Sequence, residues 1–222
     1  EALASLANVE EARAKLGKLV EHYRTWIAAQ KSEVAAEAGL EPKRRENAEF
    51  MLHRASVAAD RMAAGIELLA LAEVREAFCT ANRAMARQAR QREAQKYLTT
   101  PDLVSAPTWR AFQLGFILLN LRGLHDPLHA ERELVDLLFF PTGGGKTEAY
   151  LGLAAFSLVL RRLRNPGRRG AGVNVLMRYT LRLLTLDQLG RASALICALE
   201  LERQERNARG DARLGDWPFE IG

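Results

Sequence analysis

The sequence is poor in cysteine and lacks long apolar runs. Its 222 residues include two cysteines, Cys79 and Cys197, which stand far apart and form no C-x-x-C pair. This spacing excludes a disulfide scaffold and disfavours a structural zinc site, so we expect both to be reduced core residues of a cytoplasmic protein. The apolar runs 116–121 and 195–199 are too short to cross a membrane and are soon followed by charge. We therefore expect no membrane contact and no signal peptide.

Acidic residues are missing from a long interval in the second half of the chain. None occurs between Glu148 and Asp187, and the same interval holds seven arginines, which are Arg161, Arg162, Arg164, Arg168, Arg169, Arg178 and Arg182. Such a block attracts a polyanion in a salt-dependent way. The alternative is that its first five members keep an exposed helix end and loop soluble, and both interpretations stay open here.

Length and composition limit the size of the hydrophobic core. With 48% of its residues apolar, the chain can form one sizeable core or two small ones. We expect two, because the first half is helical in pattern throughout and the second half alternates. The formal net charge of +5 fits a nucleic-acid partner without requiring one. Since the chain begins at Glu1 rather than at methionine, we also expect a fragment or a processed form.

The first half carries apolar residues at helical spacing. Residues recurring mostly at intervals of three and four predict helices over 3–34, 44–69 and 73–96. Gly39 and Pro42 end the first of these helices. Short connections favour antiparallel packing, so residues 1–98 are predicted to form a helical bundle.

The second half alternates between two kinds of pattern. The apolar runs 135–140 and 173–179 have the length and composition of buried parallel strands, and each is followed by a helical pattern. This order predicts a parallel sheet with its ligand at the carboxyl ends of the strands. We accordingly divide the chain into a helical domain (1–98), a linker with a helix (99–132) and a parallel-sheet domain (133–222).

The segment 141–147, Pro-Thr-Gly-Gly-Gly-Lys-Thr, has the pattern of a phosphate-binding loop between a strand and a helix. Glycines let backbone N–H groups point at phosphate oxygens, Lys146 reaches the outer phosphates, and the Thr147 hydroxyl binds Mg2+. The general motif has a glycine where Phe140 or Pro141 stands here, and the alternative is a glycine-rich turn. We predict that ATP and Mg2+ are bound by Thr142, Gly143, Gly144, Gly145, Lys146 and Thr147, with Lys146 and Thr147 in catalytic roles.

Upstream of this loop lies the string Trp-Arg-Ala-Phe-Gln at 109–113. The Gln113 amide can donate one hydrogen bond to an adenine edge and accept another. Its position before a phosphate-type loop therefore makes Gln113 a candidate reader of the adenine of ATP.

Taken together, these strings resemble the first motor domain of a superfamily 2 helicase. Segment 141–148 is similar to its motif I, Arg110 and Gln113 resemble its adenine-reading motif, and 178–182 looks like its motif Ia. Within that superfamily, the longer strings at 137–153, 175–189 and 214–222 resemble the large helicase of the DISARM bacterial phage-defence systems.

The resemblance implies both a fold and an activity. The fold is an N-terminal helical bundle followed by an incomplete RecA-like parallel-sheet P-loop domain. The activity is that of an ATP-driven DNA motor in antiviral defence, acting beside a partner protein of the defence system. Residues matching motif Ia, Arg178, Thr180 and Arg182, would grip the backbone of single-stranded DNA.

Two departures leave other functions open. No Asp-Glu-x-His or similar acidic motif is present, and nothing corresponds to a second motor domain with its arginine finger. From these residues alone we therefore expect nucleotide binding at most, with hydrolysis by the intact protein. The alternatives are a nucleotide-gated protein-interaction module and a P-loop NTPase that is not a helicase.

Overall fold

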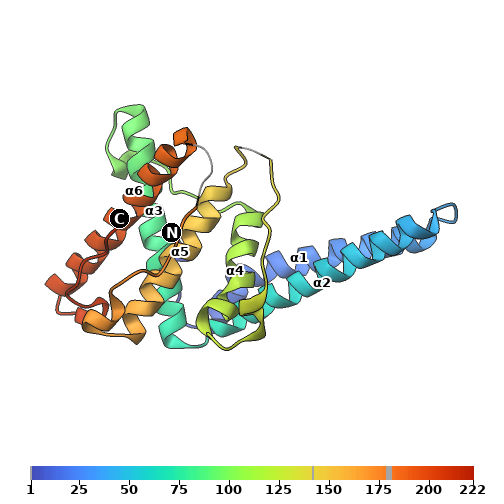
Figure 1. Ribbon diagram of the computed structural model, residues 1–222, viewed down its shortest axis with the longest axis horizontal. Helices are drawn as coiled ribbons and strands as arrows, with labels where there is room; N and C mark the ends of the chain where they lie inside the picture. The colour runs from blue at the N-terminus through green and yellow to red at the C-terminus, as the bar shows by residue number, and fades with distance from the viewer. Residues whose placement is uncertain (1, 142, 179–181) are drawn as a thin grey trace.

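The structure, a computed structural model, describes residues 2–141, 143–178 and 182–222, and its regular elements are helices (Figure 1). The helices are α1 (Val9–Ala36), α2 (Pro42–Leu68), α3 (Ala72–Tyr97), α4 (Ala111–His125), α5 (Lys146–Arg164) and α6 (Arg182–Ala208). Short 3-10 turns lie at η1 (Pro101–Leu103), η2 (Ala130–Glu133), η3 (Gly167–Gly170) and η4 (Ala212–Leu214). Helices α1 and α2 form a long antiparallel hairpin whose far half projects from the body that the other helices build.

The helices of the first half confirm the pattern of the sequence. Helix α1 starts later than predicted because Asn8 caps it, with Oδ1 accepting the Glu11 N–H at 2.9 Å. Glu11 in turn accepts the Ala7 N–H at 2.7 Å. Pro42 occupies the first turn of α2, where its missing N–H removes no intrahelical bond.

The prediction of a RecA-like parallel sheet is wrong, because the described residues contain no strand. The described residues of the two predicted strands have no regular structure, and most of their apolar side chains face solvent, with Val135 94%, Leu137 84% and Val173 83% exposed. A strand needs a neighbouring strand that pairs its N–H and C=O groups and a layer that covers its side chains. The described chain supplies neither to these two segments.

The hydrophobic core is not divided between the two halves of the sequence. One cluster contains Leu16 of α1, Phe78 of α3, Phe156 of α5 and Leu199 of α6. A second, small cluster is formed by Ile27, Leu52 and Ala59 inside the α1–α2 hairpin. The main core therefore joins elements from all three predicted domains, and the domain boundaries themselves stay a prediction.

The N-terminal end of helix α4 contacts the glycine-rich loop. Two close contacts set the position of this helix. A Cβ on Gly65 of α2 would overlap the backbone carbonyl of Leu118, so α2 and α4 cross at backbone distance. The Trp109 indole N–H, just before α4, donates to Asn82 Oδ1 of α3 at 2.8 Å. Helix α4 is thus packed directly on α2 and tied to α3 through Trp109, two positions before its first residue.

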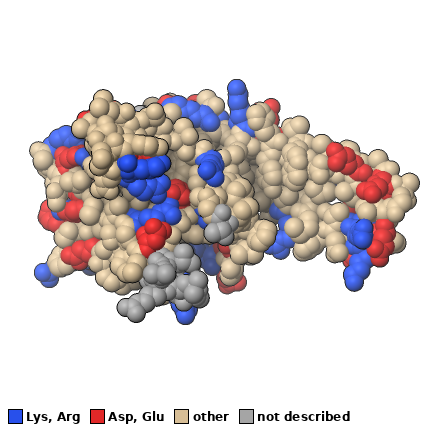
Figure 2. Space-filling model, turned by 90° about the horizontal axis from the view of Figure 1, so that it is seen from above, with Lys and Arg blue, Asp and Glu red and all other residues tan. Residues whose placement is uncertain are grey.

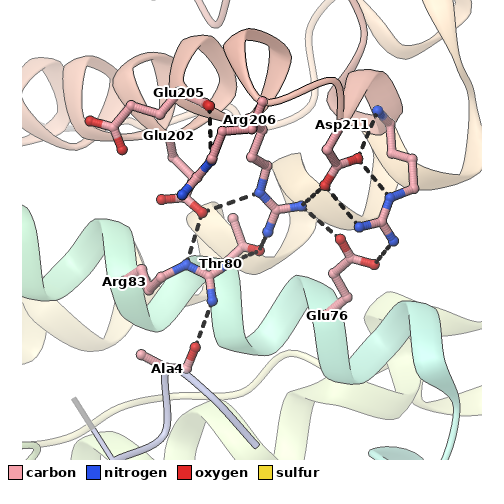
Figure 3. Close-up of polar contacts among 10 residues, drawn as sticks. Ala4, Glu76, Thr80, Arg83, Glu202, Glu205, Arg206 and Asp211 are labelled. Carbon is pink, nitrogen blue, oxygen red and sulfur yellow. Dashed lines mark hydrogen bonds and ion pairs between the residues drawn. The ribbon is translucent and has the colours of Figure 1, made fainter. Parts of the chain in front are cut away.

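A network of charged side chains joins α6 to α3 (Figure 3). The buried Arg206 donates to Thr80 Oγ1 and to Glu76, both at 2.6 Å, and to Glu202 at 3.2 Å. Arg83 of α3 donates to the same Glu202 carboxylate at 2.8 Å. Arg206 and Glu202 are buried, so losing either one would leave the charge of the other buried without this partner, which destabilises a fold.

Two observations bear on the compartment predictions. Cys79 is buried, and burial raises the pKa of its thiol, whereas Cys197 is exposed. The prediction of a core position is therefore wrong for Cys197, which lies on the face of α6 opposite the buried Leu195 and Leu199. In the parts of the chain that the structure describes, none of the helices combines the length and apolarity needed to cross a bilayer.

Candidate nucleotide-binding site

The glycine-rich loop ends where α5 begins, as the sequence predicts. Gly143 and Gly145 have φ angles of +78° and +88°, in the left-handed region that favours glycine. At Gly144 a Cβ would lie 2.5 Å from the Phe140 ring and 2.9 Å from the Pro141 carbonyl oxygen. Each of the three glycines therefore has its own steric reason, and the loop presents backbone at the positive end of a helix of 19 residues.

The Lys146 side chain folds back over the loop. Its ammonium group donates to the Phe140 carbonyl and, at 3.1 Å, to the Pro141 carbonyl. Backbone carbonyls are neutral acceptors, and a phosphate oxygen carries charge and binds an ammonium more strongly. The lysine is therefore placed to exchange these carbonyls for an anion bound at the loop.

Arg110 and Gln113 contact the loop directly, although they lie 34 and 32 positions before the loop residues that they bind. The Arg110 guanidinium donates to the Gly144 carbonyl and the Gln113 amide donates to the Gly145 carbonyl, both at 2.7 Å. Gln113 is 4% exposed, and its Oε1 accepts the backbone N–H of Arg110 at 2.8 Å. Adenine reading by Gln113 stays a prediction, and its contact with the loop is a role that sequence reasoning missed.

These two contacts orient the peptide groups of the loop. In a trans peptide the C=O and the following N–H point in opposite directions. Arg110 binds the Gly144 carbonyl and Gln113 binds the Gly145 carbonyl, so the N–H groups of Gly145 and Lys146 point away from these two side chains. Backbone N–H groups at a helix N-terminus can donate to an anion.

The segment that leads into the loop is anchored from two sides. Phe140 stacks on Phe112 of α4, with ring centroids 3.9 Å apart and planes inclined by 13°. Further upstream, Asp136 accepts two hydrogen bonds from Arg61 of α2, both at 2.7 Å, and Glu131 lies 3.3 Å from the same guanidinium. The burial and the bonding to Asp136 hold Arg61 in place, with its pKa raised mainly by that carboxylate.

Glu148, in the first turn of α5, connects the loop to two other helices. Its Oε1 accepts a hydrogen bond from Arg191 of α6 and lies 3.3 Å from Arg92 of α3. The sequence indicated neither contact, because the partners lie more than forty residues away along the chain.

Three arginines of the segment between Glu148 and Asp187 make contacts within the chain. Arg161 donates to two backbone carbonyls of the loop after η3, at 2.7 and 2.9 Å. The buried Arg162 binds the carbonyls of Trp217 and Pro218, and Arg164 binds Glu73 of α3. These three guanidinium groups therefore bind other parts of the chain in this structure. The seven arginines do not form a uniform block of free cations for a polyanion.

The predicted nucleic-acid contacts are only partly visible. Arg178 is exposed and lies four positions before α6 begins at Arg182, whose side chain is not described. Thr180, and likewise Thr142 of the loop, lie outside the described residues. On the face shown in Figure 2, basic and acidic side chains are interspersed.

Fold and site together define the class of this protein: helical in its described part, with a phosphate-type loop at the start of α5. Its sequence is 39% identical over 218 residues to the DISARM protein DrmA of Bacillus paralicheniformis, covering 91% of this chain and 19% of that protein. The chain is thus related to a DISARM protein, as its sequence strings predicted, and spans about one fifth of the length of that relative. No protein-family model matches it. Membership of helicase superfamily 2 stays a prediction.

Proposed function

We propose that this protein binds ATP and Mg2+ at residues 142–147 and is part of an ATP-driven DNA motor in phage defence. The observation that carries the nucleotide site is the arrangement around the loop. Lys146 lies over it, Gly143 and Gly145 adopt backbone conformations that glycine favours, and Arg110 and Gln113 bind its carbonyls. Similarity to a DISARM protein supports the role in defence.

In this proposal the loop residues contact different parts of the nucleotide or its Mg2+. The N–H groups of Gly143, Gly145 and Lys146 donate to phosphate oxygens, and the Gly144 N–H joins them by leaving the Pro141 carbonyl, to which it donates at 3.0 Å. Lys146 likewise leaves its two carbonyl acceptors to neutralise charge on the outer phosphates. Thr147, in the first turn of α5, would hold Mg2+ together with those phosphates, and the metal would offset their charge. Gln113 would read the adenine from its place beside Gly145.

The DNA-binding part of the proposal rests on the residues around the start of α6. Arg178, Thr180 and Arg182 would contact the backbone of a single strand, giving salt-dependent binding. Since the chain spans about one fifth of its relative, the residues that complete hydrolysis are proposed to belong to the full-length gene product, as is the contact with a defence partner protein.

A nucleotide-gated protein-interaction module is the second candidate. The projecting α1–α2 hairpin favours it, because this hairpin exposes the large apolar side chains Trp26, Phe50 and Met51. Large apolar side chains exposed on a protruding element favour protein contacts. In this candidate ATP orders the loop and DNA has no effect on turnover.

Phosphate release from ATP by the full-length gene product, with and without single-stranded DNA, distinguishes the two. The motor predicts a several-fold stimulation by DNA. Lys146→Ala removes a charge-assisted contact to phosphate, so it should weaken ATP binding by about 10- to 100-fold and abolish turnover. Turnover that is absent or indifferent to DNA, with ATP still bound, would instead support the interaction module.

A further inference from the structure

The Glu148 carboxylate stands between the phosphate-type loop and two guanidinium groups. Its Oε2 lies 3.4 Å from the position that a Cβ on Gly145 would occupy. Its Oε1 accepts from Arg191 of α6 and is 3.3 Å from Arg92 of α3. One carboxylate group thus separates the loop from two arginines that come from different helices.

Around Glu148, positive charges outnumber negative ones, and some buried polar atoms lack a hydrogen-bond partner. Two cations share a single anion, and both contact the same oxygen of it. Glu148 Oε2 and Arg191 Nε are buried and have no hydrogen-bond partner, and the same is true of Gln188 Oε1, one turn before Arg191 on α6. Of these three atoms only Arg191 Nε is a donor, and a buried donor normally has an acceptor, so an anion beside Arg191 would supply the acceptor that its Nε–H lacks.

We propose that Arg191 and Arg92 are phosphate-binding residues of the nucleotide site, held beside the loop by Glu148 until a nucleoside triphosphate binds. This inference rests on the proposed binding of ATP. The outer phosphates supply several charged oxygens, and a guanidinium binds such groups through paired N–H donors, Nε–H included. Arg191 then exchanges Glu148 for phosphate and gains an acceptor for its Nε.

The exchange needs only a side-chain movement. Gln88 of α3 donates to the backbone carbonyl of Arg191 at 2.7 Å, which fixes this part of α6 in place. Arg92 is the more exposed of the two, with 54% of its side chain accessible to solvent against 19% for Arg191. Glu148 has the opposite effect on ATP: its charge repels the phosphates and competes for both arginines.

The proposal is tested by substituting each member of the Glu148–Arg191 ion pair, because the two substitutions are expected to change ATP affinity in opposite directions. In the full-length gene product, Arg191→Ala is expected to weaken ATP binding by about tenfold or more while changing ADP affinity less. Glu148→Gln is expected to tighten ATP binding several-fold. Arg92→Ala, at a side chain 54% exposed, should weaken ATP binding without harm to folding.

Arg87→Ala is the matched control. Arg87 pairs with Glu205 and so joins the same two helices, α3 and α6. Residue 205 lies 14 positions beyond residue 191, which is about 21 Å along the helix. This variant should leave the affinities for ATP and ADP unchanged.

A purely structural ion pair gives a different result. Glu148→Gln and Arg191→Ala would then lower the melting temperature together and weaken ATP and ADP equally, and that outcome would overturn the proposal. An unaltered protein that binds no ATP would overturn the proposed nucleotide site itself. ATP binding that depends on Lys146 but is unaffected by Arg191→Ala and Arg92→Ala would overturn this inference alone.

Discussion

Gln113 contacts the glycine-rich loop and is also proposed to read adenine. Its amide bridges the Arg110 N–H and the Gly145 carbonyl, so it stabilises the loop whether or not a base is bound. We expect Gln113→Ala to weaken both ATP and GTP by about two- to tenfold through the lost loop contact. Any further loss for ATP alone measures adenine reading.

Asn120→Ala is the matched control for this measurement. Asn120 lies on the same helix and uses its amide for a bond to the Phe116 carbonyl at 2.8 Å, away from the loop. It should leave both nucleotide affinities unchanged. Equal affinities in the Gln113→Ala variant and the unaltered protein would contradict both roles of Gln113.

Glu200 makes the stability of the fold depend on pH. Two hydrogen bonds from Arg203, at 2.8 and 2.6 Å, and one from the Phe219 N–H lower the pKa of Glu200 to about 2 from its usual 4.5. A depressed carboxyl pKa stabilises the fold above pH 4.5, and this contribution is lost as the pH falls toward 2.

We therefore expect the free energy of unfolding to drop between pH 6 and pH 3 by about 2 kcal/mol through this one group. Glu200→Gln should be less stable at pH 6 and show a flatter profile, as measured by urea unfolding at several pH values. Parallel profiles for the two proteins would show that Glu200 is not responsible.

At the scale of elements, the α2–α4 crossing decides where the loop-contacting helix lies. Alanine is a better helix former than glycine by about 1 kcal/mol, yet a methyl group on Gly65 would overlap the Leu118 carbonyl. We expect Gly65→Ala to push the helices apart and destabilise the protein by about 1–3 kcal/mol in denaturant unfolding.

Gly17 of α1 offers the matched comparison. It is also inside a helix, but a Cβ there would meet nothing within 4 Å. Gly17→Ala should therefore leave stability unchanged or raise it by up to about 1 kcal/mol. Equal effects of the two substitutions would mean that the helix crossing is looser than the structure has it.

On the scale of the whole molecule, side chains from four helices converge on one loop and its flanks. Arg61 of α2 binds the lead-in, α4 supplies Arg110 and Gln113, and α3 and α6 reach Glu148 through Arg92 and Arg191. The same helices share one hydrophobic core. The loop and its flanks therefore contact elements from both halves of the chain.

Local signals in the sequence determined the helices and the loop. Apolar spacing and residues such as Asn8 and Pro42 act within a few positions, and the glycines at 143–145 meet a local backbone requirement, so these features could be predicted. Whether Arg178, Thr180 and Arg182 bind DNA stays a prediction.

The absence of strands in the described residues and the pairing of the arginines were decided by the tertiary structure alone. An apolar run such as 135–140 forms a strand only beside a partner strand, and this depends on segments far away in the chain. The partners of Arg162, Arg92 and Arg191 lie more than forty positions from them, where spacing carries no information. Sequence patterns report what a segment prefers by itself, while packing determines which segments meet and which charges pair.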